Sequence, residues 1–154
     1  MNKCLHSQSG VALVEFALVV PVLLVLTVAT TEIGRALYEY NTVAKAVRNA
    51  ARYMSMQDPA DLAVVPIAQN LVVFGRPNAD DGTEPIAPGL SLLNVPDTNI
   101  SWNTAGTNPT ISYVTVSVTN YSFTPMISTL FGLQIGGEGG ITFPRISASM
   151  RGQL

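Results

Sequence analysis

Residues 11–31 read VALVEFALVVPVLLVLTVATT, an apolar run of 21 residues with one charged side chain, Glu15. A helix needs about 20 apolar residues to cross a bilayer, so the run is predicted to be a transmembrane helix. The chain has 154 residues, of which 47% are hydrophobic and only 12% are charged. That is a low charge content for a water-soluble protein, and it agrees with a membrane anchor at the N-terminal end.

Ten mostly polar residues, MNKCLHSQSG, precede this run, and Gly10 stands directly before it. The segment 10–16 (GVALVEF) resembles the type IV prepilin cleavage motif, which a membrane aspartyl peptidase, the prepilin peptidase, cuts after the glycine on the cytoplasmic side. The resemblance implies a leader of residues 1–10, a mature chain that starts at Val11, and roles in recognition and assembly for Glu15 and Phe16. Lys3 in the leader also favours a cytoplasmic N-terminus.

A secretory signal peptide is the alternative processing route for the same region. Its cleavage site would fall near Ala29, which loosely fits the small-residue pattern such sites require. Glu15 would then lie inside the apolar core of the signal, where a charge is unfavourable. The prepilin interpretation is preferred for this reason.

Glu15 is a charged residue within an apolar span, and its insertion into the bilayer is unfavourable. A carboxylate inside hydrocarbon costs about 2.5–3.5 kcal/mol on insertion scales. Cleavage before Val11 would create an α-amino group one helical turn away, and the two charges are then expected to pair within or between subunits. A solvated Glu15 at the headgroup edge stays open as the alternative.

Pro21 lies inside the span and removes one backbone hydrogen bond, which predicts a kink or a loosened turn there. Membrane helices tolerate proline, so a kink without a role stays equally open.

Beyond Thr31 the apolar residues become periodic, with spacings of three and four that predict an amphipathic helix continuing through residues 32–57. The expected apolar stripe is Ile33, Leu37, Tyr40, Ala44, Val47, Ala51 and Met54. The expected polar side is Glu32, Arg35, Glu39, Lys45, Arg48 and Arg52. A continuous helix from Val11 to Gln57 would be about 70 Å long. Within the polar side, Lys45, Arg48 and Arg52 form a basic ridge that is either a solvated face or a partner site.

The stretch from Gly10 through residues 32–35 (EIGR) to residues 50–52 (AAR) resembles TadE-type minor pseudopilins of the tight-adherence (Flp, type IVc) pilus system. The resemblance covers residues 10–52. It implies a single-pass protein of the bacterial inner membrane whose head lies in the periplasm or outside, with functions in pilus assembly, cell adhesion and biofilm formation. The implied partners are prepilin peptidase, other pilins or pseudopilins, the inner-membrane assembly platform and the lipid bilayer. Incorporation into the filament and a role in assembly alone both stay open.

Residues 58–154 are predicted to form a small head, which gives an α+β, pilin-like fold with an antiparallel sheet. Asp58-Pro59 should end the long helix. The head is then expected to begin with a short helix over 60–73, which has Leu62, Val65, Gln69 and Val72 on one side, and an exposed loop over 75–96. Strands over 99–102 and 111–119 are predicted to form a hairpin, and residues 123–133 are predicted to form a short helix or surface loop that contacts membrane or a neighbour. A glycine turn over 136–140 and a last strand over 141–150 complete the prediction.

Catalysis is not expected. The single histidine, His6, falls in the predicted leader, and the single cysteine, Cys4, excludes an intrachain disulfide. Asp80, Asp81 and Glu84 form an acidic loop that lacks an EF-hand pattern, so a solvated loop is expected and a Ca²⁺ site stays open as the alternative. A net charge of −2 gives no basic surface for nucleic acid. No cofactor or metal is predicted.

Three functional hypotheses follow from these observations. The first is a minor pseudopilin cleaved after Gly10. The second is an uncleaved, membrane-tethered envelope binding protein whose head, residues 99–154, recognises a ligand. The third, with little support, is a tethered hydrolase that uses carboxylates such as Asp58, Asp61, Asp80 or Asp81.

Overall fold

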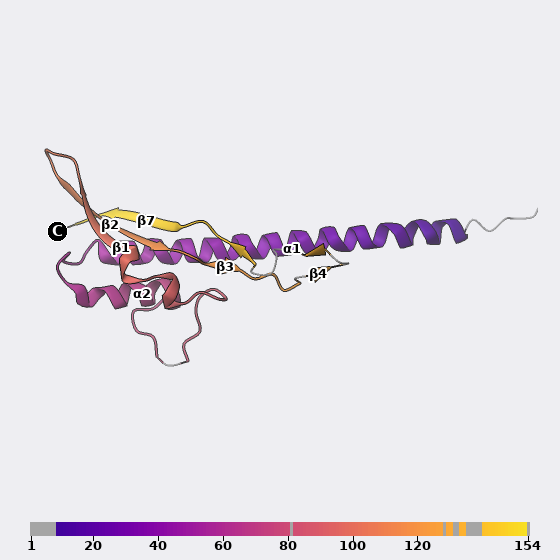
Figure 1. Cartoon of the computed structure of the whole chain (residues 1–154), viewed down its shortest axis with the longest axis horizontal. Helices are drawn as coiled ribbons and strands as arrows, with labels where there is room; N and C mark the ends of the chain where they lie inside the picture. Colours follow the sequence, from indigo (N-terminus) through magenta and orange to yellow (C-terminus); the bar gives the residue numbers. More distant parts are fainter. Residues whose placement is uncertain (1–8, 81, 128, 131–132, 135–139, 154) are drawn as a thin grey trace, which may run out of the picture.

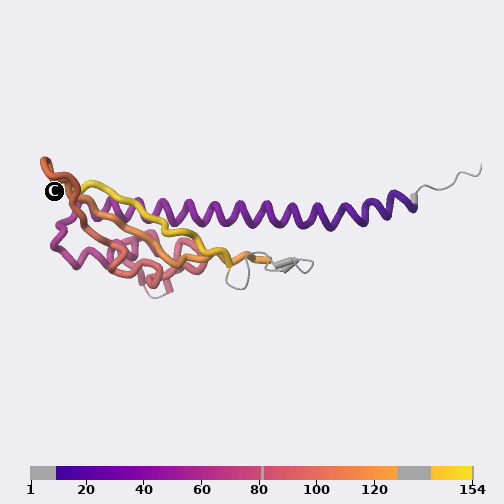
Figure 2. The backbone as a smooth tube through the Cα atoms, turned by 45° about the horizontal axis from the view of Figure 1, so that its top comes forward, coloured from indigo at the N-terminus to yellow at the C-terminus, as the bar shows by residue number. Residues whose placement is uncertain are grey.

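A computed structural model describes residues 9–80, 82–127, 129–130, 133–134 and 140–153. One long helix, α1 (Ser9–Met54), runs the length of the molecule, and a small head with an antiparallel sheet packs around its C-terminal half (Figure 1). The predicted α+β architecture is confirmed. The N-terminal half of α1 extends beyond the head as a free rod, which Figure 2 shows from a second direction.

Helix α1 is unbroken through Pro21 and joins the predicted span to the part of the helix that carries the head. It ends at Met54, three residues before the predicted end at Gln57. The Ser55 hydroxyl donates to the Arg52 carbonyl (2.8 Å), and the Met56 amide reaches back only three residues, to Tyr53 O (3.2 Å). Such tighter bonds commonly close the last turn of a helix, so the α-helix stops before the Asp58-Pro59 signal is reached.

The predicted second helix divides into a 3₁₀ turn, η1 (Leu62–Val64), and helix α2 (Val65–Phe74). Pro66 lies in the first turn of α2, where its missing amide costs nothing, so it starts the helix rather than weakening its middle. Of the four residues predicted to share one side of this helix, Val72 is buried, whereas Leu62 is 77% exposed. The face that packs inward is Val64, Ala68, Val72 and Val73.

Three strands form the main sheet, in the order β1-β2-β7, with both pairs antiparallel. Strands β1 (Ile100–Ala105) and β2 (Ile111–Val118) form the predicted hairpin. Val114, Val116 and Val118 of β2 are all buried as predicted, but the strict alternation was wrong at Ser117, which is also buried.

The predicted last strand, 141–150, is two strands. Strand β6 (Ile141–Thr142) pairs with β3 (Ser122–Phe123), and β7 (Ile146–Arg151) pairs with β2. Pro144 lies between β6 and β7 and has no amide to donate to a ladder, which accounts for the break. Strands β4 (Thr129–Leu130) and β5 (Leu133–Gln134) form a separate antiparallel pair. Most of the predicted glycine turn, 136–139, lies outside the described residues.

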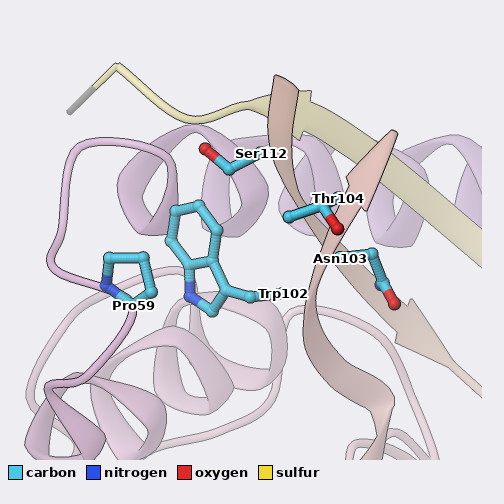
Figure 3. Close-up of a pocket in the computed structure, with 5 residues that line it drawn as sticks. All are labelled: Pro59, Trp102, Asn103, Thr104 and Ser112. Atoms are coloured by element: carbon cyan, nitrogen blue, oxygen red, sulfur yellow. The ribbon is translucent and has the colours of Figure 1, made fainter. Parts of the chain in front are cut away.

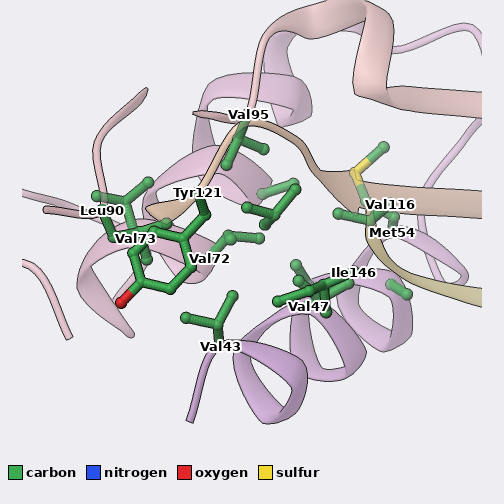
Figure 4. Close-up of a cluster of buried hydrophobic side chains, with 14 of the residues drawn as sticks. Val43, Val47, Met54, Val72, Val73, Leu90, Val95, Val116, Tyr121 and Ile146 are labelled. Atoms are coloured by element: carbon green, nitrogen blue, oxygen red, sulfur yellow. The ribbon is translucent and has the colours of Figure 1, made fainter. Parts of the chain in front are cut away.

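The hydrophobic core fills the space between α1, α2 and the sheet (Figure 4). Its members include Val43, Val47, Ala50, Met54, Val72, Val73, Leu90, Val95, Val116, Tyr121 and Ile146. The outer half of α1 is therefore one wall of the core, and the head has no closed interior without it.

The loop predicted over 75–96 is exposed only in its first part. Its second part contains the 3₁₀ turn η2 (Leu92–Asn94) and buries Ala87, Leu90 and Val95, and a further turn, η3 (Asp97–Asn99), leads into β1. Asn94 holds this part in place, because its side-chain amide donates to the carbonyls of Thr119 (3.2 Å) and Asn120 (3.0 Å). Turn composition indicated a loop correctly but gave no sign of this long-range bonding.

Met54→Ala is expected to lower the free energy of unfolding by about 2–5 kcal/mol, because it leaves a cavity where α1 meets the sheet. Met54 is 1% exposed and Met56 is 53% exposed. Met56→Ala is therefore the matched control and should change stability by less than about 0.5 kcal/mol. Urea unfolding of the detergent-solubilised chain, followed by the fluorescence of Trp102, measures both, and equal effects would contradict the assigned core.

Candidate functional site

The N-terminal part of α1 carries the predicted processing and assembly residues, and its apolar side chains are open to the surroundings. Val11, Leu13, Phe16 and Leu18 are each between 68% and 72% exposed. Helix α1 is long and apolar enough to cross a membrane, and its most apolar 18-residue window has no buried residue. The head therefore leaves this segment free for lipid or for neighbouring helices.

Gly10 and Val11 lie in the first turns of α1, and Glu15 lies one turn further on, on the same side as Val11. Gly10, Val11, Val14, Glu15 and Leu18 together line a shallow groove on the helix. A side chain added at Gly10 would meet open space. The structure thus places Glu15 within reach of the group that cleavage before Val11 would create. The leader itself, residues 1–8, lies outside the described residues, and neither the cleavage nor the pairing is tested by the structure.

Pro21 is partly exposed and sits within regular helix. The helix does not melt there, and a bend with a role stays a prediction.

Beyond the span, α1 meets the head through a charged cluster formed by Glu32, Arg35, Glu39 and Tyr121, which we call the neck cluster. Arg35 donates to Glu32 Oε2 (2.9 Å) and to Glu39 Oε1 (3.4 Å). The Tyr121 hydroxyl donates to Glu39 Oε2 (3.0 Å), and Phe123 stacks under the guanidinium of Arg35, 5.3 Å from ring centroid to Cζ. Both glutamates are 6% exposed.

The neck cluster corrects the predicted polar side of the helix. Glu32 and Glu39 were expected to face solvent, yet they lie on the buried side, in line with Val43 and Ala50. Conversely, Ile33 (61% exposed) and Leu37 (58% exposed) of the predicted apolar stripe face outward. Two buried carboxylates are tolerable because Arg35 and Tyr121 supply charge and donors in place of water. The only sequence signal was the spacing of seven between the two glutamates, which places them on one side of the helix.

Tyr121 is the residue of the head that ties the neck cluster to the core. Its ring stacks on Phe143 at 5.5 Å between centroids, and its hydroxyl has a second hydrogen-bond partner in Pro88 O (3.2 Å). Burial, together with the hydrogen bond to Glu39 and the negative charge of that carboxylate, raises the pKa of Tyr121. The phenol therefore stays neutral and acts as a donor throughout the physiological pH range.

The basic ridge is exposed as predicted along Lys45, Arg48 and Arg52. Arg48 Nε donates to the Ala44 carbonyl of its own helix (3.1 Å). Arg48 also lines a groove between α1 and β7, together with Tyr40, Arg145 and Met150. A solvated face and a partner surface both fit these observations.

A second surface feature lies at the far end of the head, where Pro59, Trp102, Asn103, Thr104 and Ser112 line a shallow pocket (Figure 3). The Trp102 ring lies between Pro59 and Ser112. The lining side chains are neutral, so the pocket suits an apolar or planar group better than a charged one. Sequence reasoning did not single out Trp102 as part of a surface site.

Two carboxylates of the third hypothesis, those of Asp58 and Asp61, serve as local turn caps. Asp58 Oδ1 accepts the Ala60 amide (2.8 Å), and Asp61 Oδ1 accepts the Ala63 amide (2.9 Å). Asp80 takes part in a turn in which its carbonyl accepts the Thr83 amide (3.0 Å). Asp81 lies outside the described residues. Among the described residues, no group of three metal-ligating side chains comes together.

Comparison with known proteins agrees with the arrangement of α1. Residues 10–52 match the family model described as TadE-like protein. The resemblance drawn from the sequence is confirmed over this TadE-like segment, which covers the span, the neck glutamates and Arg52. The family is a structural, pilus-associated one rather than an enzyme family. Searches of curated proteins and of solved structures found no match to the chain.

Tyr121→Phe is expected to cost about 1–3 kcal/mol of stability, because the buried carboxylate of Glu39 loses a donor. Tyr38→Phe is the matched control, since Tyr38 is 74% exposed and should tolerate the change. The raised pKa of Tyr121 determines how the stability difference between wild type and Tyr121→Phe changes with pH. Wild type should keep its full advantage over Tyr121→Phe below the ordinary tyrosine pKa of about 10 and lose it progressively above that pH. Urea titrations of the three proteins between neutral pH and pH 11 measure this, and equal losses for both variants would refute the role assigned to Tyr121.

Proposed function

We propose that this protein is a membrane-anchored minor pseudopilin that takes part in assembly of a tight-adherence type IV pilus and is processed by prepilin peptidase after Gly10. The TadE-like match over residues 10–52 carries the proposal, together with the free, apolar N-terminal half of α1. In this proposal the N-terminal half of α1 crosses the bacterial inner membrane with its N-terminus in the cytoplasm, and the head lies on the other side.

The geometry supports a role for α1 as the assembly element. Val11 and Glu15 share one side of the helix, so the new α-amino group of one subunit can neutralise Glu15 of the same or of a neighbouring subunit in a low-dielectric setting. Further along, Ile33, Leu37 and Tyr38 (74% exposed) form an outward-facing apolar stripe beyond the span. A helix that exposes such a stripe above the bilayer has a surface for packing on another helix.

The second candidate is an uncleaved, membrane-tethered binding protein, and the Trp102 pocket is the observation that favours it. The pocket is shallow and formed by one exposed edge of the head, whereas the free part of α1 spans several turns. The pilus proposal therefore accounts for more of the exposed apolar surface.

The cleavage prediction is that the mature chain starts at Val11 only in cells that contain the prepilin peptidase. Intact mass and N-terminal sequencing of membrane-extracted protein measure the start. Gly10→Val should abolish cleavage without disturbing the helix, because the Gly10 position opens onto free space. Gly34→Val is the matched control, since the Gly34 position is equally open and lies away from the site. An uncut chain in the presence of the peptidase would favour the tethered binding protein, and a start near Thr30 would favour a secreted head.

The assembly prediction concerns the charge of Glu15. Glu15→Gln keeps the size of the side chain and removes the charge, so cleavage should proceed largely as in wild type while pilus assembly is impaired. Glu84→Gln, at an exposed carboxylate of the head, is the control and should leave both unchanged. Counting pili by electron microscopy beside the cleavage assay separates the two effects. Normal piliation in the Glu15→Gln strain would rule out the charge pairing.

A further inference from the structure

The segment that follows β3 returns to α1 at the level where the predicted span ends. Met126 and Ile127 lie against the helix and line a small groove with Thr27, Val28, Thr31, Glu32 and Arg35. The Met126 amide donates to Glu32 Oε2 (3.4 Å), so the neck cluster fixes the position of this segment along the helix. We call Met126 and Ile127 the apolar tip of the head.

The helix at this level is suited to the edge of the hydrocarbon. The hydroxyls of Thr27, Thr30 and Thr31 donate to the carbonyls four residues earlier, at 2.8–2.9 Å. Hydroxyls that bond within their own helix need no water, which allows them to lie in or beside lipid. Glu32 is the first charged residue after the span, and its side chain belongs to the neck cluster. The outer boundary of the hydrocarbon is therefore expected near Thr27–Thr31, the level of the apolar tip.

The chemistry of the apolar tip also matches a lipid boundary. Met126 is 77% exposed and Ile127 is 38% exposed. The sequence from Phe123 to Ile135, FTPMISTLFGLQI, contains no charged residue. Of the elements labelled in Figure 1, β4 is the part of the head that reaches farthest toward the N-terminal end of α1. Its backbone pairs with β5, which lowers the cost of placing it beside lipid.

We propose that the apolar tip enters the outer interface of the bilayer and gives the head a second membrane contact beside α1. Lipid is the occupant because a helix that spans the bilayer through Thr31 necessarily places Met126 at lipid level, whether or not other subunits are present. The contact depends on α1 as a membrane anchor and does not depend on pilus assembly. Because the head is packed rigidly on α1, this second contact would fix the tilt of the whole molecule relative to the bilayer.

The test uses the full chain with Cys4→Ser, so that one introduced cysteine at a time carries the environment-sensitive fluorophore NBD. Met126→Cys reports on the apolar tip. Leu62→Cys is the matched control, because Leu62 has the same 77% exposure but lies just after the far end of α1. Leu23→Cys reports on the span itself. Each protein is reconstituted at high dilution in phosphatidylethanolamine and phosphatidylglycerol vesicles, with and without lipids that carry a doxyl quencher on the upper part of the acyl chain.

The expected result is a blue-shifted emission and strong doxyl quenching at positions 126 and 23, with neither at position 62. Emission at position 126 that matches position 62 would overturn the proposal. A blue shift at 126 without doxyl quenching would also overturn it and would assign the apolar tip to protein contact. Loss of quenching at position 23 would show that the anchor itself is wrong, whereas failure of cleavage or piliation leaves this readout unaffected. Trp102 fluorescence checks that each variant retains the folded head.

Discussion

The fold depends on one helix, α1, whose two halves lie in different environments. The first half of α1 is apolar on all sides, and the second half contributes residues such as Val43, Val47 and Met54 to the interior of the head. Without α1, the sheet and α2 would lose the side chains that close their shared core. The head therefore folds on α1 itself, and the continuous helix leaves no linker between its apolar N-terminal half and the head.

Charged side chains, rather than a break in the helix, mark the point where the exposed half of α1 gives way to the half that carries the head. Just beyond the span, Glu32 and Glu39 lie on the inner side of the helix, where Arg35 forms an ion pair with each carboxylate and the Tyr121 hydroxyl donates to Glu39. This arrangement leaves Ile33 and Leu37 on the outer surface, the reverse of what a soluble amphipathic helix would do. Polar groups are buried where the head begins, and apolar groups remain available to other helices.

Local sequence signals predicted the parts of the fold that local forces decide. The span, the helix beyond it and the β1–β2 hairpin follow from apolar length, periodicity and the turn residues between Ala105 and Ile111. The buried side of α1 could not be predicted, because Arg35 and Tyr121, 86 residues apart in sequence, together make Glu39 acceptable in the interior. The packing of residues 86–95 was missed for the same reason, since the side chain of Asn94 finds its partners beyond β2. For the candidate site, Gly10, Val11 and Glu15 come from the resemblance to the prepilin motif and stay predictions, whereas the neck cluster and the Trp102 pocket needed the tertiary structure.

The continuous helix also makes the protein a spacer of fixed length. From Thr31 to Met54, α1 rises about 35 Å at 1.5 Å per residue, and the chain turns back at Pro59 beside Trp102. With the N-terminal half of α1 in the bilayer, as proposed, the Trp102 pocket is held at a set height above it, comparable to the thickness of the hydrocarbon. A molecule that binds this end of the head therefore binds at a fixed distance from the end of the span at Thr31. Changing that distance without rotating the head about the helix would require whole turns of α1 to be added or removed.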